Sequence, residues 1–338
     1  MRPIIIHHLN ELCLGGTEKM LQIMMKYFVK EGTYNHVLAY RAQGRRDREE
    51  YFREIMGENK LIAYASYPEF VAIVGKLKPF CIHRYSAGIP EFPFVAPVKV
   101  HTKHFVSTSV FGNQDDTIDI SKVIFVSKHI QHLAQRFDPK YIVVRNAIEA
   151  PYTDEVLFPE LKDKFVFGHI GRPDANTYSD TNLRAYKKIE NENTMFLWLP
   201  QNPMVNNSIK ELGIKNIDMI PATTDETFLS KFYNTIDVLA HSRKDGECNP
   251  AVMWEAMAHG KPIVSHYGLP FNGHVEVIKN CGFCVAPEDV NEYARIMERF
   301  IDGTINYYNL SRNALDNWKN TCQAEDIANQ QLDIYKKL

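Results

Sequence analysis

Short runs of β-branched and aromatic residues recur along this chain, and helical segments separate them. The first run, residues 4–7, precedes Gly15-Gly16. Thr17 then suits the N-cap of a helix, and Glu18 suits the positive end of the helix dipole. Apolar residues recur there at the spacing of one helix face: Met20, Leu21, Met24, Tyr27 and Phe28. This alternation predicts an α/β fold whose parallel sheets are covered by helices on both faces.

The same unit repeats through both halves of the chain. Further strands are predicted at residues 37–40, 80–83, 98–101, 123–126 and 141–144. Ser127 is expected to cap a helix that runs to about Phe137. A second series of strands is predicted at residues 165–170, 195–199, 217–220, 238–241 and 262–265, with a helix at 228–234.

The length of 338 residues suggests two domains, at roughly 150 residues per domain. Residues 151–164 are rich in proline, acidic residues and lysine without clear periodicity, which is typical of a linker. We expect a first domain at 1–155, a second at 156–310, and a C-terminal helix at 311–338 that packs back toward the first domain. Ligands of such sheets bind where strand C-termini and helix N-termini meet.

Composition narrows the class of protein. The net charge is −2 and both signs are mixed along the chain, so no nucleic-acid partner is expected. The six cysteines suggest buried thiols in a reducing, cytoplasmic compartment. Cys281 and Cys284 have CxxC spacing without a second pair, and Asp115-Asp116 lies in a polar loop, so no metal site is expected. No apolar run approaches the roughly 18 residues of a membrane span, which leaves peripheral membrane association open.

Residues 246–260 combine the features of a buried helix with those of an anion site. Asn249 suits an N-cap, Pro250 the first helical position and Gly260 the C-terminal stop, which predicts a helix of about ten residues. Nearly every face of it is apolar, so Glu255 needs a partner inside the protein. The free N–H groups of the helix start can hold a phosphate. A ribose diol can donate two hydrogen bonds to Glu255, and sugar hydroxyls can bind Glu247.

Glu247 and Glu255 have EX7E spacing, and Ala-Met-Ala-x-Gly-x-Pro-Ile-Val follows. This segment resembles the retaining GT-B glycosyltransferases, in particular glycosyltransferase family 4. Five other segments resemble the same family in order along most of the chain: Gly15-Gly16-Thr17-Glu18, Ile124-Phe-Val-Ser127, Val144-Arg-Asn146, His169-Ile-Gly-Arg172 and Asp237-Val-Leu-Ala-His-Ser242.

The resemblance implies a GT-B architecture, in which two Rossmann-like domains with parallel sheets face each other across a cleft. It implies transfer of a sugar, with retained configuration, from a UDP- or GDP-sugar to a glycan, a lipid-linked acceptor or another hydroxyl. The nucleotide-sugar is then a substrate, and no cofactor is implied. Metal is not needed either, because cationic side chains and a helix N-terminus carry the phosphate charge.

The same resemblance implies roles for individual residues. Glu247 would contact the donor sugar, Glu255 the ribose, and Arg172 the leaving diphosphate. The donor site would also include Gly16, Cys248, Asn249, Pro250 and Ala251. On the acceptor side, Gly15 and Gly16 would let the backbone approach the substrates. His104 would be a catalytic residue beside the reacting sugar, with His101 as the second candidate.

Two departures from the family pattern keep alternatives open. The usual lysine a few residues after the arginine is missing after Arg172, and Pro250 replaces a glycine. An inactive nucleotide-sugar-binding relative is therefore one alternative, and a nucleotide-sugar epimerase is the other. Glu255 could instead pair with an internal arginine, and Arg172 could form a salt bridge between domains. Base selection is expected near residues 221–225.

Overall fold

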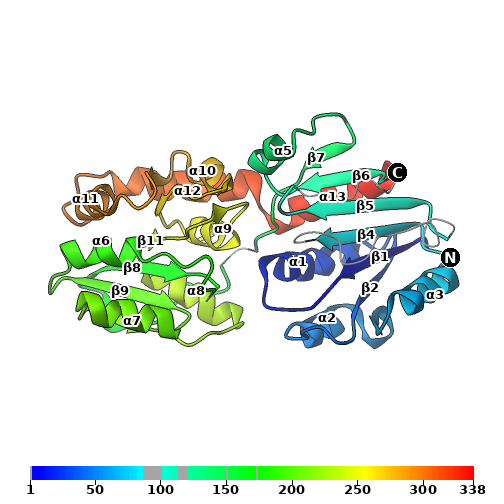
Figure 1. Cartoon of the computed structure of the whole chain (residues 1–338), viewed down its shortest axis with the longest axis horizontal. Helices are drawn as coiled ribbons and strands as arrows, with labels where there is room; N and C mark the ends of the chain where they lie inside the picture. The colour runs from blue at the N-terminus through cyan, green and yellow to red at the C-terminus, as the bar shows by residue number, and fades with distance from the viewer. Residues whose placement is uncertain (1, 87–100, 113–119, 150, 173) are drawn as a thin grey trace. The chain divides into compact units, whose positions relative to one another are not determined.

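The structure is a computed structural model that describes residues 2–86, 101–112, 120–149, 151–172 and 174–338 (Figure 1). The chain divides into two compact units. Unit 1 comprises Met1–Ile148 and Cys322–Leu338, and unit 2 comprises Glu149–Thr321. The predicted metal-free turn at Asp115-Asp116 and most of the predicted strand at 98–101 lie outside the described residues.

Unit 1 contains a parallel sheet, and its described strands follow the order β3-β2-β1-β4-β5-β6-β7. These strands are β1 (Ile4–Leu9), β2 (Asn35–Arg41), β3 (Leu61–Tyr64), β4 (Cys81–Ser86), β5 (His104–Ser109), β6 (Lys122–Phe125) and β7 (Tyr141–Val143). The described helices are α1 (Gly16–Glu31), α2 (Glu49–Met56), α3 (Tyr67–Leu77), α5 (Lys128–Ala134) and α13 (Ala324–Lys336). The predicted parallel α/β architecture of this half is confirmed.

Local sequence explains where two of these helices begin. The hydroxyl of Ser127 accepts a hydrogen bond from the Ile130 amide at 3.2 Å, so Ser127 caps α5 as predicted. Helix α1 instead begins at Gly16, with Gly15 rather than Thr17 at the N-cap position, and the Gly15 carbonyl accepts from the Lys19 amide. A Cβ on Gly15 would lie 2.3 Å from a carboxylate oxygen of Glu18. Gly15 thus leaves room for the Glu18 side chain at the helix start.

Unit 2 contains a second parallel sheet with the described order β10-β9-β8-β11-β13-β15. Its strands are β8 (Phe165–Ile170), β9 (Thr194–Leu199), β10 (Ile217–Met219), β11 (Val238–Ala240), β13 (Ile263–His266) and β15 (Gly282–Val285). A small ladder joins β12 (Gly246–Glu247) to β14 (Phe271–Asn272). The described helices are α6 (Thr181–Ile189), α7 (Pro203–Leu212), α8 (Glu226–Thr235), α9 (Ala251–Ala258), α10 (Gly273–Ile278), α11 (Val290–Ile301) and α12 (Tyr307–Thr321).

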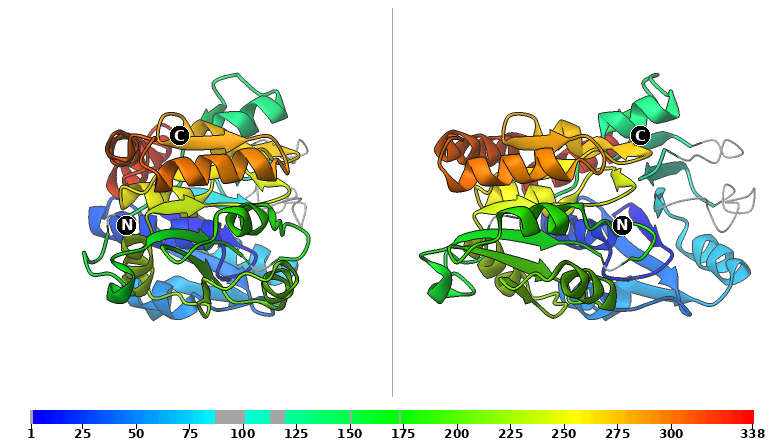
Figure 2. Two further views of the ribbon diagram at one scale, coloured as in Figure 1. Left: turned by 90° about the vertical axis from the view of Figure 1, so that its left-hand side faces the viewer. Right: turned by 60° about the vertical axis from the view of Figure 1, so that its left-hand side comes forward.

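In the unit 2 sheet, the direction in which successive strands are added reverses between β8 and β11, which is the reversal point of the sheet. From β8 the chain first adds β9 and β10 on one side, and then β11, β13 and β15 on the other. Helices cover both faces of the sheet (Figures 1 and 2). In a doubly wound sheet the crevice at the carboxyl ends of the two central strands is the usual ligand site. The topology therefore directs attention to the ends of β8 and β11.

The predicted C-terminal helix at 311–338 is two helices. Helix α12 packs against α9 within unit 2, whereas α13 packs against α1 within unit 1. Between them the Cys322 carbonyl accepts a hydrogen bond from the Ile148 amide at 2.9 Å. The return to unit 1 therefore starts at Cys322, because the preceding helix buries its apolar side in unit 2.

The predicted linker at 151–164 belongs to unit 2. Its backbone is fixed on α8, since the Tyr152 amide donates to the Ser230 hydroxyl and the Leu157 amide donates to the Thr235 hydroxyl. The division between the units consequently falls at Ile148–Glu149. Among the helices that the structure describes, none is long and apolar enough to cross a membrane.

Candidate functional site

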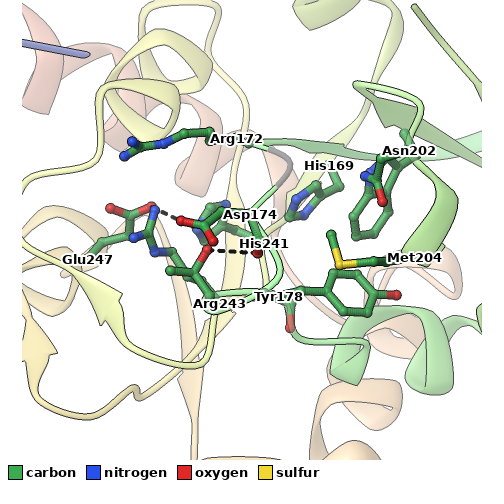
Figure 3. A pocket seen from close by; sticks show the side chains of 13 residues that line it. His169, Arg172, Asp174, Tyr178, Asn202, Met204, His241, Arg243 and Glu247 are labelled. Carbon is green, nitrogen blue, oxygen red and sulfur yellow. Dashed lines mark hydrogen bonds and ion pairs between the residues drawn. The ribbon is translucent and has the colours of Figure 1, made fainter. Parts of the chain in front are cut away.

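A pocket opens at the reversal point of the unit 2 sheet (Figure 3). The turn after β8 contributes Gly171 and Arg172, and the segment after β11 contributes His241, Ser242 and Arg243. The remaining lining residues come from the end of β8, the loop before α6, the end of β9, the start of α7 and β12: His169, Asp174, Thr177, Tyr178, Trp198, Asn202, Met204 and Glu247. The pocket thus lies where the strand order predicts a ligand site.

One wall of this pocket is a stack of buried rings. The His169 and Trp198 rings are stacked with centroids 3.8 Å apart, and the His241 ring is parallel to His169 at 5.3 Å. Burial, followed by the neighbouring His241, lowers the pKa of His169 well below its ordinary value. His169 is therefore neutral in the folded protein and forms part of a rigid wall, held also by Asn182 at 3.2 Å.

Glu247 projects from the short strand β12, whose geometry depends on Gly246. Gly246 has a φ of +70°, and a Cβ at this position would lie 1.7 Å from the Phe271 carbonyl oxygen. Only glycine therefore allows β12 to pair with β14. Through this ladder the backbone fixes the point from which Glu247 enters the pocket.

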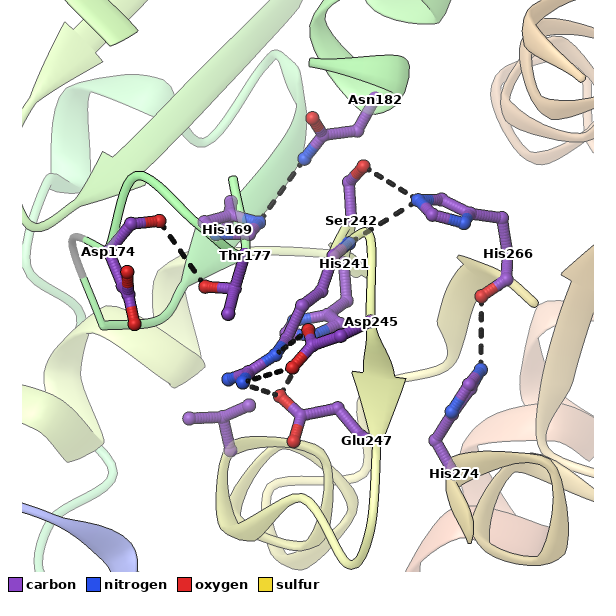
Figure 4. Close-up of polar contacts among 12 residues, drawn as sticks. His169, Asp174, Thr177, Asn182, His241, Ser242, Asp245, Glu247, His266 and His274 are labelled. Carbon is purple, nitrogen blue, oxygen red and sulfur yellow. Dashed lines mark hydrogen bonds and ion pairs between the residues drawn. The ribbon is translucent and has the colours of Figure 1, made fainter. Parts of the chain in front are cut away.

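The Glu247 carboxylate is mostly buried, with 18% of the side chain exposed, and lies beside the His241 ring (Figure 4) and the Arg243 guanidinium. Its Oε1 is 3.3 Å from Nε2 of His241 and 3.5 Å from Nη1 of Arg243. Burial raises the pKa of Glu247, but the interaction with His241 and the charge of Arg243 outweigh it and lower this pKa below its ordinary value. Glu247 is therefore a carboxylate at neutral pH, which accepts but does not donate hydrogen bonds.

Helix α9 follows, and it differs from the prediction at its start. It spans eight residues, Ala251–Ala258, and Pro250 occupies the position before the helix. The Asn249 side chain does not cap it, because its Oδ1 accepts from the Trp254 indole at 2.8 Å. Gly260 has the predicted left-handed conformation, with a φ of +67°. Cys248, Asn249 and Pro250 are all buried, so their side chains support the loop, and Ala251 begins the helix.

Glu255 has a buried partner inside unit 2, as its position required, but the partner is a tyrosine. The Tyr233 hydroxyl donates to Oε2 of Glu255 at 2.7 Å. Only 9% of Glu255 is exposed, and the residue is not among those that line the pocket. Burial and the charge of Glu255 raise the pKa of Tyr233 well above its ordinary value, so the phenol stays a donor.

Arg172 lies in the turn after β8, where it is exposed and lines the pocket. Neither lysine of α6, Lys187 or Lys188, is among the described residues that line the pocket. Nζ of Lys187 binds Oε2 of Glu190 at 2.8 Å and the Gly213 carbonyl at 2.6 Å. Among the described lining residues, the groups that are positively charged at every relevant pH are Arg172 and Arg243.

The unit 1 candidates occupy two different edges of their sheet. Gly15 and Gly16 follow β1 at the carboxyl edge. His104 is the first residue of β5 and pairs with Cys81, the first residue of β4, at the amino edge. Its Nδ1 contacts the Ser121 hydroxyl at 3.4 Å. This position argues against the predicted catalytic role of His104, because ligands of parallel sheets bind at the carboxyl edge. His101 lies in the turn before β5 and is no better placed.

Several lining residues were not assigned a role from the sequence, above all Arg243, Tyr178, Asn202 and Met204. Each of these residues follows a predicted strand, and that position is a signal for a ligand site. Too many other residues share this position for the sequence spacing alone to single them out. All six cysteines are free thiols, and Cys284 lies on β15. Among the described residues, no group of three or more His, Cys, Asp or Glu side chains is placed to hold a metal ion.

Comparison with known proteins agrees with this geometry. Residues 156–317 match the family described as glycosyl transferases group 1. No curated protein matches the sequence. The glycosyltransferase of Rickettsia africae ESF-5 superposes with a TM-score of 0.81 at 18% identity, covering 99% of this chain and 98% of that chain.

Two further solved structures are similar over their whole length. HepE of Anabaena, in complex with UDP and glucose, has a TM-score of 0.79 at 16% identity, and both chains are fully covered. Sucrose-phosphate synthase of Thermosynechococcus elongatus has a TM-score of 0.76 at 15% identity, with 99% of each chain covered. The chain has the fold of GT-B glycosyltransferases, with two Rossmann-like halves, and its residues 156–317 are similar to the family described as glycosyl transferases group 1.

Proposed function

We propose that this protein is a retaining glycosyltransferase that holds a nucleotide-diphosphate sugar in the unit 2 pocket. The observation that carries the proposal is that Arg172 and Glu247 line one cavity at the reversal point of the sheet. A guanidinium suits a diphosphate, and a carboxylate that only accepts hydrogen bonds suits sugar hydroxyls. The similarity of residues 156–317 to the glycosyl transferases group 1 family supports the same class of reaction.

In this proposal Glu247 orients the donor sugar, and Arg172 stabilises the charge that develops on the diphosphate. The bond from the anomeric carbon to the diphosphate oxygen breaks as the bond to the acceptor oxygen forms on the same face. The acceptor proton passes to an oxygen of the departing diphosphate. The protein contributes position and charge, which act most strongly in a site with little water.

We assign the ribose to Glu255 and the helix start at Ala251 to phosphate. The Tyr233 hydroxyl holds the Glu255 carboxylate in one orientation, which supports a fixed acceptor for a diol. Because HepE of Anabaena was solved with UDP and glucose, UDP-sugars are the first donors to test, followed by GDP-sugars. Acceptors would be glycans, lipid-linked sugars or other hydroxyls. The free thiols suit a cytoplasmic enzyme, either free in the cytoplasm or peripherally associated with a membrane.

A thermal-unfolding screen against UDP, GDP and their sugars tests the donor assignment, because a ligand stabilises the folded state according to its concentration over its Kd. We expect one base to stabilise the protein, and its sugar to add to the effect. In Glu247→Gln, nucleotide binding should persist while turnover falls by about a hundredfold. Equal turnover in Glu247→Gln would contradict the role of Glu247.

The missing lysine favours one alternative, a nucleotide-sugar-binding protein without transferase activity. Tight binding without turnover on any acceptor would support it. An epimerase is distinguished by incubating the donor alone, because it would convert the sugar without any acceptor.

A further inference from the structure

The diphosphate site that we propose needs a second cation, and Arg243 is the described lining residue that can supply it. A diphosphate carries more negative charge than Arg172 alone offsets. Lys187 is held by Glu190, and Lys244 is exposed and lies outside the pocket lining. Arg243 lines the pocket together with Arg172 (Figure 3).

The guanidinium of Arg243 is fixed along one edge only. Its Nε donates to Oδ1 of Asp245 at 2.6 Å and its Nη2 donates to Oδ2 at 2.9 Å, which is a bidentate pair. Its Nη1 lies 3.5 Å from Oε1 of Glu247, which is too long for a strong hydrogen bond. Of the five N–H donors of an arginine, Asp245 therefore engages two and leaves the Nη1 edge beside Glu247.

The loop that carries Arg243 is rigid, so this orientation is built in before a ligand arrives. The Lys244 amide donates to the Thr177 carbonyl at 3.0 Å, and the Gly246 amide donates to the Arg243 carbonyl at 3.2 Å. The Phe271 amide also donates to the Asp245 carbonyl at 3.0 Å. With 20% of its side chain exposed, Arg243 is mostly shielded from water, which strengthens its interaction with an anion.

We infer that Arg243 is the second cation of the diphosphate site and donates from its Nη1 edge to the donor phosphates, in place of the absent lysine. The inference rests on the proposed function. It also explains the neighbouring acids. Asp245 clamps the guanidinium, and Glu247 lies next to the edge that faces the ligand, so one arginine links phosphate binding to sugar binding.

Calorimetric titration with UDP and with uridine, which lacks the diphosphate, tests the inference. If the wild type binds GDP instead, GDP and guanosine replace them. In Arg243→Gln we expect UDP affinity to fall about ten- to hundredfold, the range for hydrogen bonds to charged groups, while uridine affinity is unchanged. Lys244→Gln is the matched control, since it removes the adjacent exposed cation of the same loop, and it should bind both ligands as the wild type does.

If Arg243→Gln does not fold, Arg243→Lys provides the same comparison. Lysine keeps the charge but cannot hold Asp245 by two bonds and reach a phosphate as well, so UDP affinity should fall several-fold without a change for uridine. Wild-type UDP affinity in both variants would overturn the inference. It would also be overturned if the variants bound UDP normally and lost only the additional affinity that the glucose gives UDP-glucose, because Arg243 would then only position Glu247. A wild-type protein that binds neither UDP nor GDP would instead overturn the proposed function itself.

Discussion

The hydroxyl of Tyr233, on α8, lies 2.7 Å from Oε2 of Glu255, on α9. The same hydroxyl also lies 3.2 Å from the Val252 carbonyl, at the start of α9. A buried carboxylate inside an apolar helix is costly unless a donor stabilises it. Tyr233 therefore gives the buried Glu255 carboxyl group a hydrogen-bond donor inside unit 2 and holds it in place.

The first prediction concerns this pair. In Tyr233→Phe we expect Glu255 to lose its orientation, and the preference for UDP over 2′-deoxy-UDP to disappear, with a stability loss of about 1 kcal/mol. Parallel calorimetry with the two nucleotides measures the preference.

Tyr186→Phe is the control for that variant. The Tyr186 hydroxyl is also buried in unit 2 and donates to the Asn216 carbonyl at 2.9 Å, away from Glu255. It should cost similar stability and keep the preference for the ribose hydroxyl. A preserved preference in Tyr233→Phe would show that Glu255 does not bind ribose through this orientation.

The second prediction concerns the backbone of β12. Gly246→Ala places a Cβ 1.7 Å from the Phe271 carbonyl, so the β12–β14 ladder must shift and move Glu247. We expect turnover to fall at least tenfold and stability to fall by about 2 kcal/mol. Gly213→Ala is the control, because Gly213 also has a positive φ, of +63°, but has open space around it. It should lose stability and keep turnover, and equal turnover losses in the two variants would contradict this explanation.

The third prediction concerns acid stability of unit 1. Buried histidines there are joined by hydrogen bonds, from His36 to His7 at 2.9 Å and from His83 to the hydroxyls of Thr108 and Tyr335 at 2.8 and 2.6 Å. Burial lowers the pKa of His83 to about 3, and burial is also the largest cause that lowers the pKa of His36 to about 4. Both residues are therefore neutral in the folded protein and take up protons on unfolding.

The sign of the pH effect follows from these shifts. A folded pKa below the ordinary value of 6.5 gives full stability above pH 6.5 and a loss as pH falls toward the folded pKa. Each such histidine should cost up to about 1.4 kcal/mol per pH unit below 6.5. Urea unfolding at pH 7.5, 6.5 and 5.5 measures this slope.

His83→Gln should reduce the dependence on pH, although it lowers stability at pH 7.5. His132→Gln is the control, because His132 is exposed on α5, and it should leave the dependence unchanged. An identical slope in His83→Gln and the wild type would contradict the assignment to the buried network.

Most strands of both sheets follow from the sequence because they are short apolar runs between strong turn signals, but β3, β5 and β15 were not predicted. The position of His104 shows a limit of predicting strands from apolar runs. A strand was predicted at 98–101, which would leave His104 just beyond the carboxyl end of a strand, at the ligand edge. The strand in the structure begins at His104, so the same residue stands at the opposite edge. A displacement of a few residues along a strand reverses which edge a side chain occupies.

The loop before α9 shows a second limit. Asn249 is a residue type that often caps helices, but its side chain accepts a hydrogen bond from the Trp254 indole instead. Glu255 was expected to need a partner, yet Tyr233 is 22 residues away and comes from another helix. Local pattern identifies which residues require a partner, whereas packing of separate elements decides which partner they obtain.

The most direct test of the proposed transfer is ¹H NMR of donor breakdown, with water as the acceptor when no other is supplied. For an α-linked UDP- or GDP-sugar we predict that the released sugar appears first as the α anomer, before it equilibrates in solution, and that Arg172→Gln slows the release at least tenfold because the leaving diphosphate loses its cation. Release of the β anomer first, or release at the wild-type rate in Arg172→Gln, would contradict retaining transfer from this pocket.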